Sequence, residues 1–166
     1  MAERKAAWVT ALAIFVFDQV TKWIVIGPLQ LKERYQIELL PIFNLTWTEN
    51  RGISLGLGQA ETDLQRWLLV AGTALVAGLV GFWITREKAR GDQLALAMVL
   101  GGALGNIVDR TRFGYVVDFL DLHFNGFRPF LVFNVADAAI SIGVVVLLLR
   151  ALLAKPEPKE ESTEHV

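Results

Sequence analysis

Long apolar runs alternate with polar stretches along this chain. Four of them lie near residues 6–26, 67–84, 93–108 and 131–154. An α-helix rises ~1.5 Å per residue, so ~20 residues are needed to cross the hydrocarbon core of a bilayer. The third run is too short by itself and must extend into its charged flank. The pattern therefore predicts four transmembrane helices, at about 6–26, 67–84, 93–110 and 131–154.

The first run could also belong to a secretory signal peptide, because Arg4 and Lys5 precede it. Asp18 and Lys22 interrupt this run, however, and no A-x-A cleavage site follows it. We therefore expect the segment to persist as a membrane helix.

The polar stretch between the first two runs carries a different period. Apolar and polar residues alternate over 35–39 and again over 43–48, and Pro41 lies between the two segments. This alternation is typical of half-buried strands, and proline interrupts pairing. We expect two short strands in a small sheet whose apolar face rests on the membrane surface or on the helices. The predicted fold is an all-α membrane core, a four-transmembrane-helix bundle, with a small extracytoplasmic β-sheet, built as one domain over residues 1–154.

Basic residues are denser on one side of the predicted spans. Segments 1–5, 85–92 and 155–166 carry seven Lys or Arg residues within 25 positions, whereas the loops 27–66 and 109–130 carry seven within 62. Cytoplasmic loops are enriched in Lys and Arg. We therefore expect both termini in the cytoplasm and the two longer loops outside, with the charged tail from residue 155 disordered.

The composition agrees with a membrane protein. Hydrophobic residues make up 54% of the chain, and its mean hydropathy is +0.44. A net charge of −1 and a pI of about 6.1 argue against a nucleic-acid partner, which usually needs a basic face. The chain contains no cysteine, which excludes disulfides, thiol nucleophiles and cysteine metal sites. Four of the five tryptophans lie at predicted membrane boundaries, where aromatic belts occur: Trp8, Trp23, Trp67 and Trp83.

Ionisable residues inside the spans are informative, because burying one at a helix centre costs ~2.5–3.5 kcal/mol on insertion scales. Asp18 and Lys22 stand at i and i+4 on one helical face, which predicts an ion pair with a structural role. The third span ends in GGALGNIVDR, where Gly101 and Gly105 favour a close approach of two helices. Asp109 beside Arg110 is either an interfacial ion pair or a site carboxylate, and we favour the structural role.

Two further aspartates lie in apolar surroundings. Asp118 belongs to GYVVDFLD in the second outer loop, where a surface strand could carry it without any function. Asp137 belongs to FNVADAAI, in which Asn134, Asp137 and Ser141 share one face of the last span. Asp137 could simply cap the helix. Its expected depth, a full turn beyond Phe133, favours a functional role instead.

The available side chains limit the chemistry. A histidine-based triad has one candidate base and no serine elbow, so serine hydrolysis is disfavoured. An oxygen-rich metal site remains open, with the candidate ligands Asp109, Asp118, Asp121, His123 and Asp137. The other possibility is a carboxylate dyad, in which one member draws a proton from water and the other protonates the leaving amide. Asp118 and Asp137 come from separate elements on the outer side and satisfy that topology.

The ordered motifs resemble those of lipoprotein signal peptidases, the signal peptidase II family. They are DQVTK from Asp18, NRG from Asn50, GGALGNIVDR from Gly101, GYVVDF from Gly114 and FNVAD from Phe133. The resemblance covers residues 18–140, and GN-x-x-DR followed by VVDF and FN-x-AD is its specific part. One segment departs from the family pattern: Ile53, Ser54 and Leu55 follow Gly52 where the family often reads G-A-A-F.

This resemblance implies an activity and roles for individual residues. It implies that Asp118 and Asp137 are catalytic, without a metal or organic cofactor. The residues that line or support the substrate site would be Asn50, Gly52, Asn106, Arg110 and Asn134, and those of a supporting polar shell Asp18, Lys22 and Asp109. The family cleaves prolipoproteins on the amino side of a diacylglyceryl-modified cysteine at the outer face of the bacterial inner membrane, and globomycin inhibits it.

Two other classes of function remain to be weighed. A proton-coupled transporter or channel would use Asp18, Lys22 and Asp137 as a relay across the bilayer. The clustering of polar residues toward one side of the membrane argues against it. A non-enzymatic assembly subunit would leave Asp118 without a role.

Overall fold

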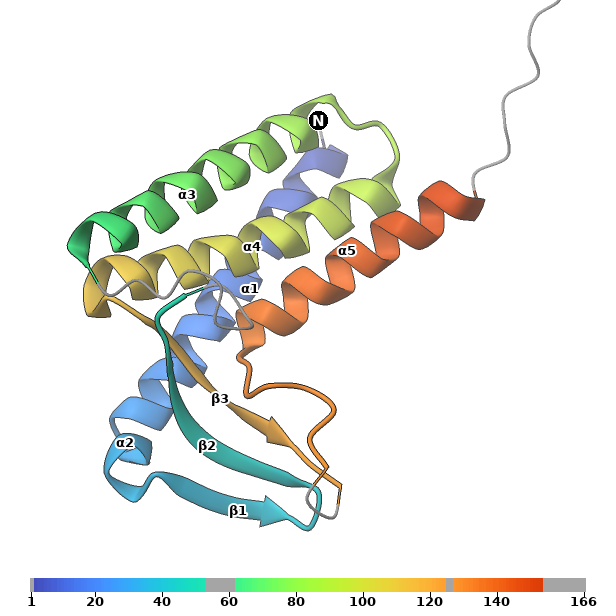
Figure 1. Ribbon diagram of the computed structural model, residues 1–166. Helices are drawn as coiled ribbons and strands as arrows, with labels where there is room; N and C mark the ends of the chain where they lie inside the picture. Colours follow the sequence, from blue (N-terminus) through green and yellow to red (C-terminus); the bar gives the residue numbers. More distant parts are fainter. Residues whose placement is uncertain (1, 53–61, 125–126, 154–166) are drawn as a thin grey trace, which may run out of the picture.

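Four long helices form the body of the protein (Figure 1). The computed structural model describes residues 2–52, 62–124 and 127–153. The long helices are α1 (Ala2–Ile26), α3 (Asp63–Arg86), α4 (Arg90–Phe113) and α5 (Val135–Leu153). Each is long and apolar enough to cross a membrane, as predicted. The expected tail from residue 155 and the departure at 53–55 lie outside the described residues.

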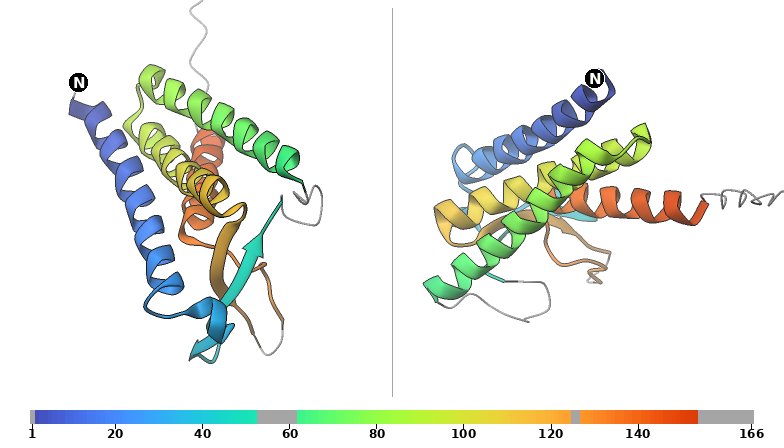
Figure 2. Two further views of the ribbon diagram at one scale, coloured as in Figure 1. Left: turned by 90° about the vertical axis from the view of Figure 1, so that its left-hand side faces the viewer. Right: turned by 90° about the horizontal axis from the view of Figure 1, so that it is seen from above.

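Helix α4 lies at the centre, where it packs against α1, α3 and α5 (Figures 1 and 2). It is the least apolar of the four spans, because its neighbours cover much of its surface. Glycines allow two of these contacts: a Cβ at Gly101 would lie 2.5 Å from the carbonyl oxygen of Ala11, and one at Gly102 would lie 2.5 Å from that of Ala136. The small residues therefore serve helix packing, as expected.

The helices differ from the predicted spans by up to four residues at an end, and the starts of α3 and α5 have a visible cause or consequence. Helix α3 begins four residues before the apolar run, because Thr62 and Gln65 form a capping box that satisfies the first free N–H groups. Helix α5 begins at Val135 and not at residue 131. Asp137 therefore stands in the first turn of α5, nearer the helix start than expected. Ser141 follows one turn later on the same face, and it is exposed.

The sheet has three antiparallel strands in the order β1-β2-β3, where two were predicted. A short helix, α2 (Leu31–Arg34), leads into β1 (Gln36–Leu40) and β2 (Phe43–Asn50), and β3 (Val116–Leu122) follows α4. Strand β3 carries Asp118. Its run VVDFLDL lacks a clear alternation because residues on both of its faces are buried, and the period-two pattern is then lost.

The apolar face of the sheet rests on the end of the helical bundle. Val25 of α1 and Leu31 of α2 form one buried cluster with Trp47 of β2 and with Val117 and Phe119 of β3. Of the two expected supports for the sheet, the structure shows the helices. The left view of Figure 2 shows the sheet at the end of the bundle away from the N-terminus. The junction between helices and sheet is where the polar motifs meet.

Candidate active site

Asp118 and Asp137 converge at the junction of β3, α4 and α5, and asparagines join them. Asn134 donates from Nδ2 to Oδ1 of Asp118 at 2.6 Å and from its backbone N–H to Oδ2 of Asp137 at 3.3 Å. Asn106 of α4 donates from Nδ2 to Oδ1 of Asp137 at 2.8 Å. The two carboxylates thus share a continuous hydrogen-bond network, and two separate elements supply them.

Asn134 directly precedes the first residue of α5 and caps this helix. Its Oδ1 accepts a hydrogen bond from the backbone N–H of Asp137 at 2.9 Å, which satisfies a free donor of the first helical turn. This cap leaves the amide nitrogen Nδ2 pointing to Asp118, and the same nitrogen donates to Oδ1 of Asn106 at 3.3 Å. Asn134 therefore caps the helix and contacts both carboxylates, that of Asp118 through its side chain and that of Asp137 through its backbone N–H.

Asn50 holds Asp118 from the opposite side, at the end of β2. Its Nδ2 donates to Oδ2 of Asp118 at 3.1 Å, and its Oδ1 accepts from the backbone N–H of Gly52 at 3.2 Å. The carbonyl of Gly52 in turn accepts from Nη2 of Arg110 at 3.4 Å. Nε of Arg110 is buried and has no partner among the described residues. Arg110 therefore brings a free donor to the charged groups of this region.

The environment of Asp118 favours its protonated form. The residue is 2% exposed. Burial raises the pKa of Asp118 to about 7, and the negative charge of Asp137 adds to the rise, while the hydrogen bonds from Asn50 and Asn134 oppose it. One proton is therefore readily held by the pair near neutral pH, as an acid–base mechanism with two carboxylates requires.

A buried ion triad lies directly behind the pair of aspartates. Nζ of Lys22 is 2.9 Å from Oδ2 of Asp18 and 2.8 Å from Oδ2 of Asp109, and it donates to Asn106 at 3.3 Å. The predicted pair of Asp18 and Lys22 thus forms. The suggested pair of Asp109 with its neighbour Arg110 is wrong, since Asp109 is directed toward α1 and bonds Lys22.

Each carboxylate of the triad also holds the backbone next to one aspartate of the pair. Asp18 accepts from the N–H of Ala136 at 3.0 Å, and Asp109 accepts from the N–H of Val117 at 3.1 Å. Ala136 precedes Asp137, and Val117 precedes Asp118. The triad therefore fixes the backbone on which the pair is mounted. Gly105 makes room for it, because a Cβ there would collide with Asp18.

The sequence interpretation missed Gln19 and Arg66. Gln19 donates from Nε2 to Oδ1 of Asp109 at 3.1 Å and so completes the surroundings of the triad. Arg66 of α3 donates to the carbonyl oxygens of Arg110 and Thr111 at 2.8 and 2.6 Å, which joins α3 to the end of α4. Gln19 lies inside the DQVTK motif and could have been found there. Nothing in the sequence signals the contacts of Arg66.

Asp121 does not join the candidate site. Its carboxylate accepts from Nε and Nη2 of Arg128 at 3.0 and 3.1 Å and from Thr46 at 2.8 Å. Burial alone would raise the pKa of Asp121, but these hydrogen bonds outweigh it and lower that pKa. Across residues 2–52, 62–124 and 127–153, no three His, Asp or Glu side chains are grouped as a metal site would need. The five proposed ligands therefore do not assemble.

The polar groups gather at one end of the bundle. Asp18 and Lys22 contact the start of α5 beside Asp137. The described residues thus place these three groups at one level and not along a path across the membrane, which counts against a transporter relay. Four helices long and apolar enough to span a membrane, with two aspartates held together at one end, form the arrangement expected of a membrane aspartic protease.

Comparisons with known proteins identify the kind of protease. A family model described as signal peptidase (SPase) II matches residues 10–153. The lipoprotein signal peptidase of Sphingopyxis alaskensis is 64% identical over 143 residues, which cover 86% of this chain and 83% of that protein. The lipoprotein signal peptidase of Rhizorhabdus wittichii is 58% identical over 149 residues, which cover 90% and 86%. The chain belongs to the signal peptidase II family.

Solved structures agree with this assignment. Two structures described as bacterial membrane enzymes superpose with TM-scores of 0.79 and 0.76, at 26% and 28% identity. The first comparison covers 96% of this chain and 95% of the other, and the second covers 92% and 95%. The protein is therefore a multi-pass bacterial membrane protease, and the alternative of a non-enzymatic assembly subunit is excluded.

Proposed function

We propose that this protein removes signal peptides from prolipoproteins whose lipobox cysteine already carries diacylglycerol, and that it cleaves on the amino side of that cysteine. The observation that carries the proposal is the pair of aspartates at the junction of the helices and the sheet. A signal peptide is apolar and can stay among the helices, while the scissile bond reaches the polar junction. Exposed apolar side chains along the helices, such as Phe17 and Leu75, suit the acyl chains of the lipid.

In the proposed reaction the two aspartates divide the proton transfers. Asp137, ionised, takes a proton from a water molecule, whose oxygen attacks the carbonyl carbon of the residue before the cysteine. Asp118, which holds the shared proton, gives it to the nitrogen of the cysteine as the C–N bond breaks. Arg110 stabilises the oxyanion through its free Nε, because a preorganised donor in a dry site lowers the barrier. The proton on Asp137 then passes back to Asp118 for the next cycle.

The proposal includes an orientation. With both termini cytoplasmic, the sheet and the two aspartates face the outer side of the inner membrane, where the mature part of a secreted lipoprotein emerges. The denser basic segments at the other ends of the helices support this orientation. Sensitivity to globomycin follows from the family resemblance and belongs to the same proposal.

A reconstituted cleavage assay tests the proposal. Purified protein in detergent is incubated with two lipobox peptides that differ only in the diacylglyceryl group on cysteine, and the products are identified by mass spectrometry. We expect the modified peptide to be cleaved before the cysteine and globomycin to block the reaction. Equal cleavage of the unmodified peptide would contradict the proposed requirement for the diacylglyceryl group. Cleavage at another bond would contradict the proposed cleavage position.

A further inference from the structure

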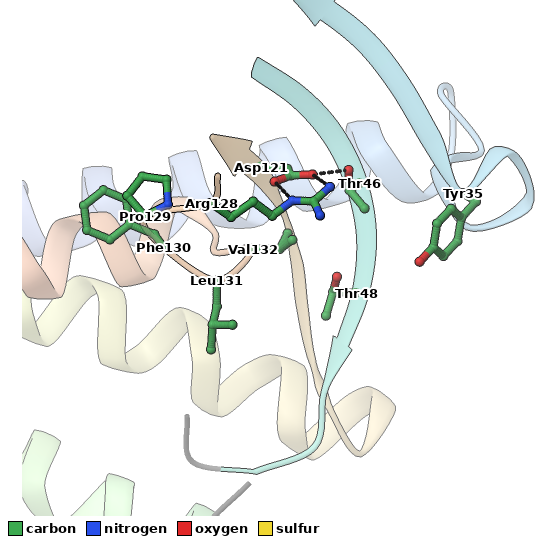
Figure 3. Close-up of a pocket in the computed structure, with 9 residues that line it drawn as sticks. All are labelled: Tyr35, Thr46, Thr48, Asp121, Arg128, Pro129, Phe130, Leu131 and Val132. Atoms are coloured by element: carbon green, nitrogen blue, oxygen red, sulfur yellow. Dashed lines mark hydrogen bonds and ion pairs between the residues drawn. The ribbon is translucent and has the colours of Figure 1, made fainter. Parts of the chain in front are cut away.

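A pocket of about 360 Å³, lined by both polar and apolar side chains, lies on the sheet (Figure 3). Its volume falls within the ~300–1,000 Å³ range of ligand pockets. Thr46 and Thr48 of β2 form one wall, and the segment 129–132 forms the other. The ion pair of Asp121 and Arg128 lies between them, and none of these residues takes part in the reaction described above.

Both walls of the pocket lead to the aspartates. Thr48 is the strand partner of Asp118, and two residues further along β2 Asn50 donates to the same carboxylate. The opposite wall continues through Phe133, which pairs with Leu120 of β3, to Asn134, the second donor to Asp118. Strand residues rise ~3.3 Å each, so the pocket begins ~7 Å from these asparagines along either wall. A peptide bound at the dyad would enter it after about two residues.

The position of the pocket decides which side of the scissile bond it can receive. The sheet extends from the end of the helical bundle, and β2 reaches the bundle with its Asn50 end (Figure 1). The signal peptide precedes the bond and needs an apolar environment among the helices. The chain after the cysteine has no such need and leaves the bundle. We propose that this pocket binds the first residues of the mature lipoprotein, in an extended conformation, after the modified cysteine.

The side chains of the pocket suit a peptide main chain and small uncharged side chains. Asp121 and Arg128 neutralise each other, so no net charge selects for a charged residue. Arg128 is held through Nε and Nη2, and its remaining nitrogen, Nη1, has no partner among the described residues. That nitrogen and the hydroxyl of Thr48 can bond peptide carbonyl oxygens. The inference rests on the proposed function, because only that reaction places a substrate chain here.

Two peptides of different length test the inference. Both carry the same signal segment and the same modified cysteine, but one ends a single residue after the cysteine and the other ends five residues after it. For the unaltered protein we expect kcat/KM to be on the order of tenfold higher for the longer peptide, the effect of one or two net hydrogen bonds. Equal values for the two peptides would overturn the inference, and cleavage of neither would instead overturn the proposed function.

Substitutions in the pocket test whether it is the source of the higher kcat/KM of the longer peptide. Thr48→Phe fills the pocket from one wall and Leu131→Trp from the other, where the side chain is 66% exposed and tolerates enlargement. Both should cleave the short peptide at the normal rate and lose the advantage of the long one. If Thr48→Phe fails with both peptides, Leu131→Trp alone decides. Glu49→Gln, next to Thr48 but bonded to Lys32, is the matched control and should keep the advantage. An advantage that survives in Leu131→Trp would refute the inference.

Discussion

Replacing Lys22 by methionine removes the one cation of the buried triad while keeping a side chain of similar length. The two carboxylates of Asp18 and Asp109 then face each other without a counter-charge, and Lys22 is only 2% exposed. Removing one partner of a buried ion pair costs ~3–5 kcal/mol. For a chain of 166 residues, each kcal/mol lowers Tm by ~2–4 °C, so we expect a loss of about 6–20 °C.

Thermal unfolding in detergent, followed by tryptophan fluorescence, measures this loss. Lys32→Met is the matched control, because Lys32 is exposed and its pair with Glu49 lies on the surface. It should change Tm little. Adding Asp18→Asn to Lys22→Met removes one of the two unpaired charges and keeps an oxygen for the N–H of Ala136, so part of the loss should return. If Lys22→Met unfolds within 2 °C of the unaltered protein but is inactive, Lys22 acts in the chemistry and our account of it fails.

Three further predictions concern the proton on Asp118 and the independence of the activity from metal ions. The rate of cleavage should fall as pH rises through about 7, where Asp118 loses its proton, and a rate still rising at pH 9 would contradict the assigned acid. Because the pKa of Asp118 is 3.8 in its usual environment and about 7 in the fold, stability is lost as the pH rises through that range, and the full cost is reached above pH 7. Asp118→Asn should therefore gain stability relative to the unaltered protein as the pH rises from 3 to 8, by up to about 4 kcal/mol, and a constant difference would refute this. Activity should be unchanged by EDTA, since two carboxylates and water suffice, and loss restored by a divalent ion would require a metal.

The spans, and the two aspartates that the structure brings together, could be predicted from sequence because both leave local signals. Length and apolar composition define a membrane helix. A carboxylate among apolar residues is unusual enough to be noticed, which singled out Asp118 and Asp137. Their convergence follows from the order of the elements along the chain: Asp118 lies in the outer loop before the last span, and Asp137 lies at the start of that span.

The rest depended on contacts that no local pattern reports. Strand β3 was missed because burial of both faces removes the alternation that reveals a strand. The partner of Asp109 was wrong because a neighbour in sequence was preferred to Lys22, which lies 87 positions away and arrives only when α1 packs on α4. The depth of Asp137 was misjudged because Asn134 caps the helix, and a cap is hard to separate from an apolar run that begins before it.

The central claim is that Asp118 and Asp137 act together on one transition state. Initial rates of cleavage of the lipid-modified peptide test it most directly, for Asp118→Asn, Asp137→Asn and the double variant, with Asp63→Asn at an exposed position as the control. Each single change should lower the rate by ~10²–10⁴-fold in a folded protein. The double variant should be hardly slower than either single one. Substantial activity in either single variant, or losses that multiply in the double one, would contradict the dyad.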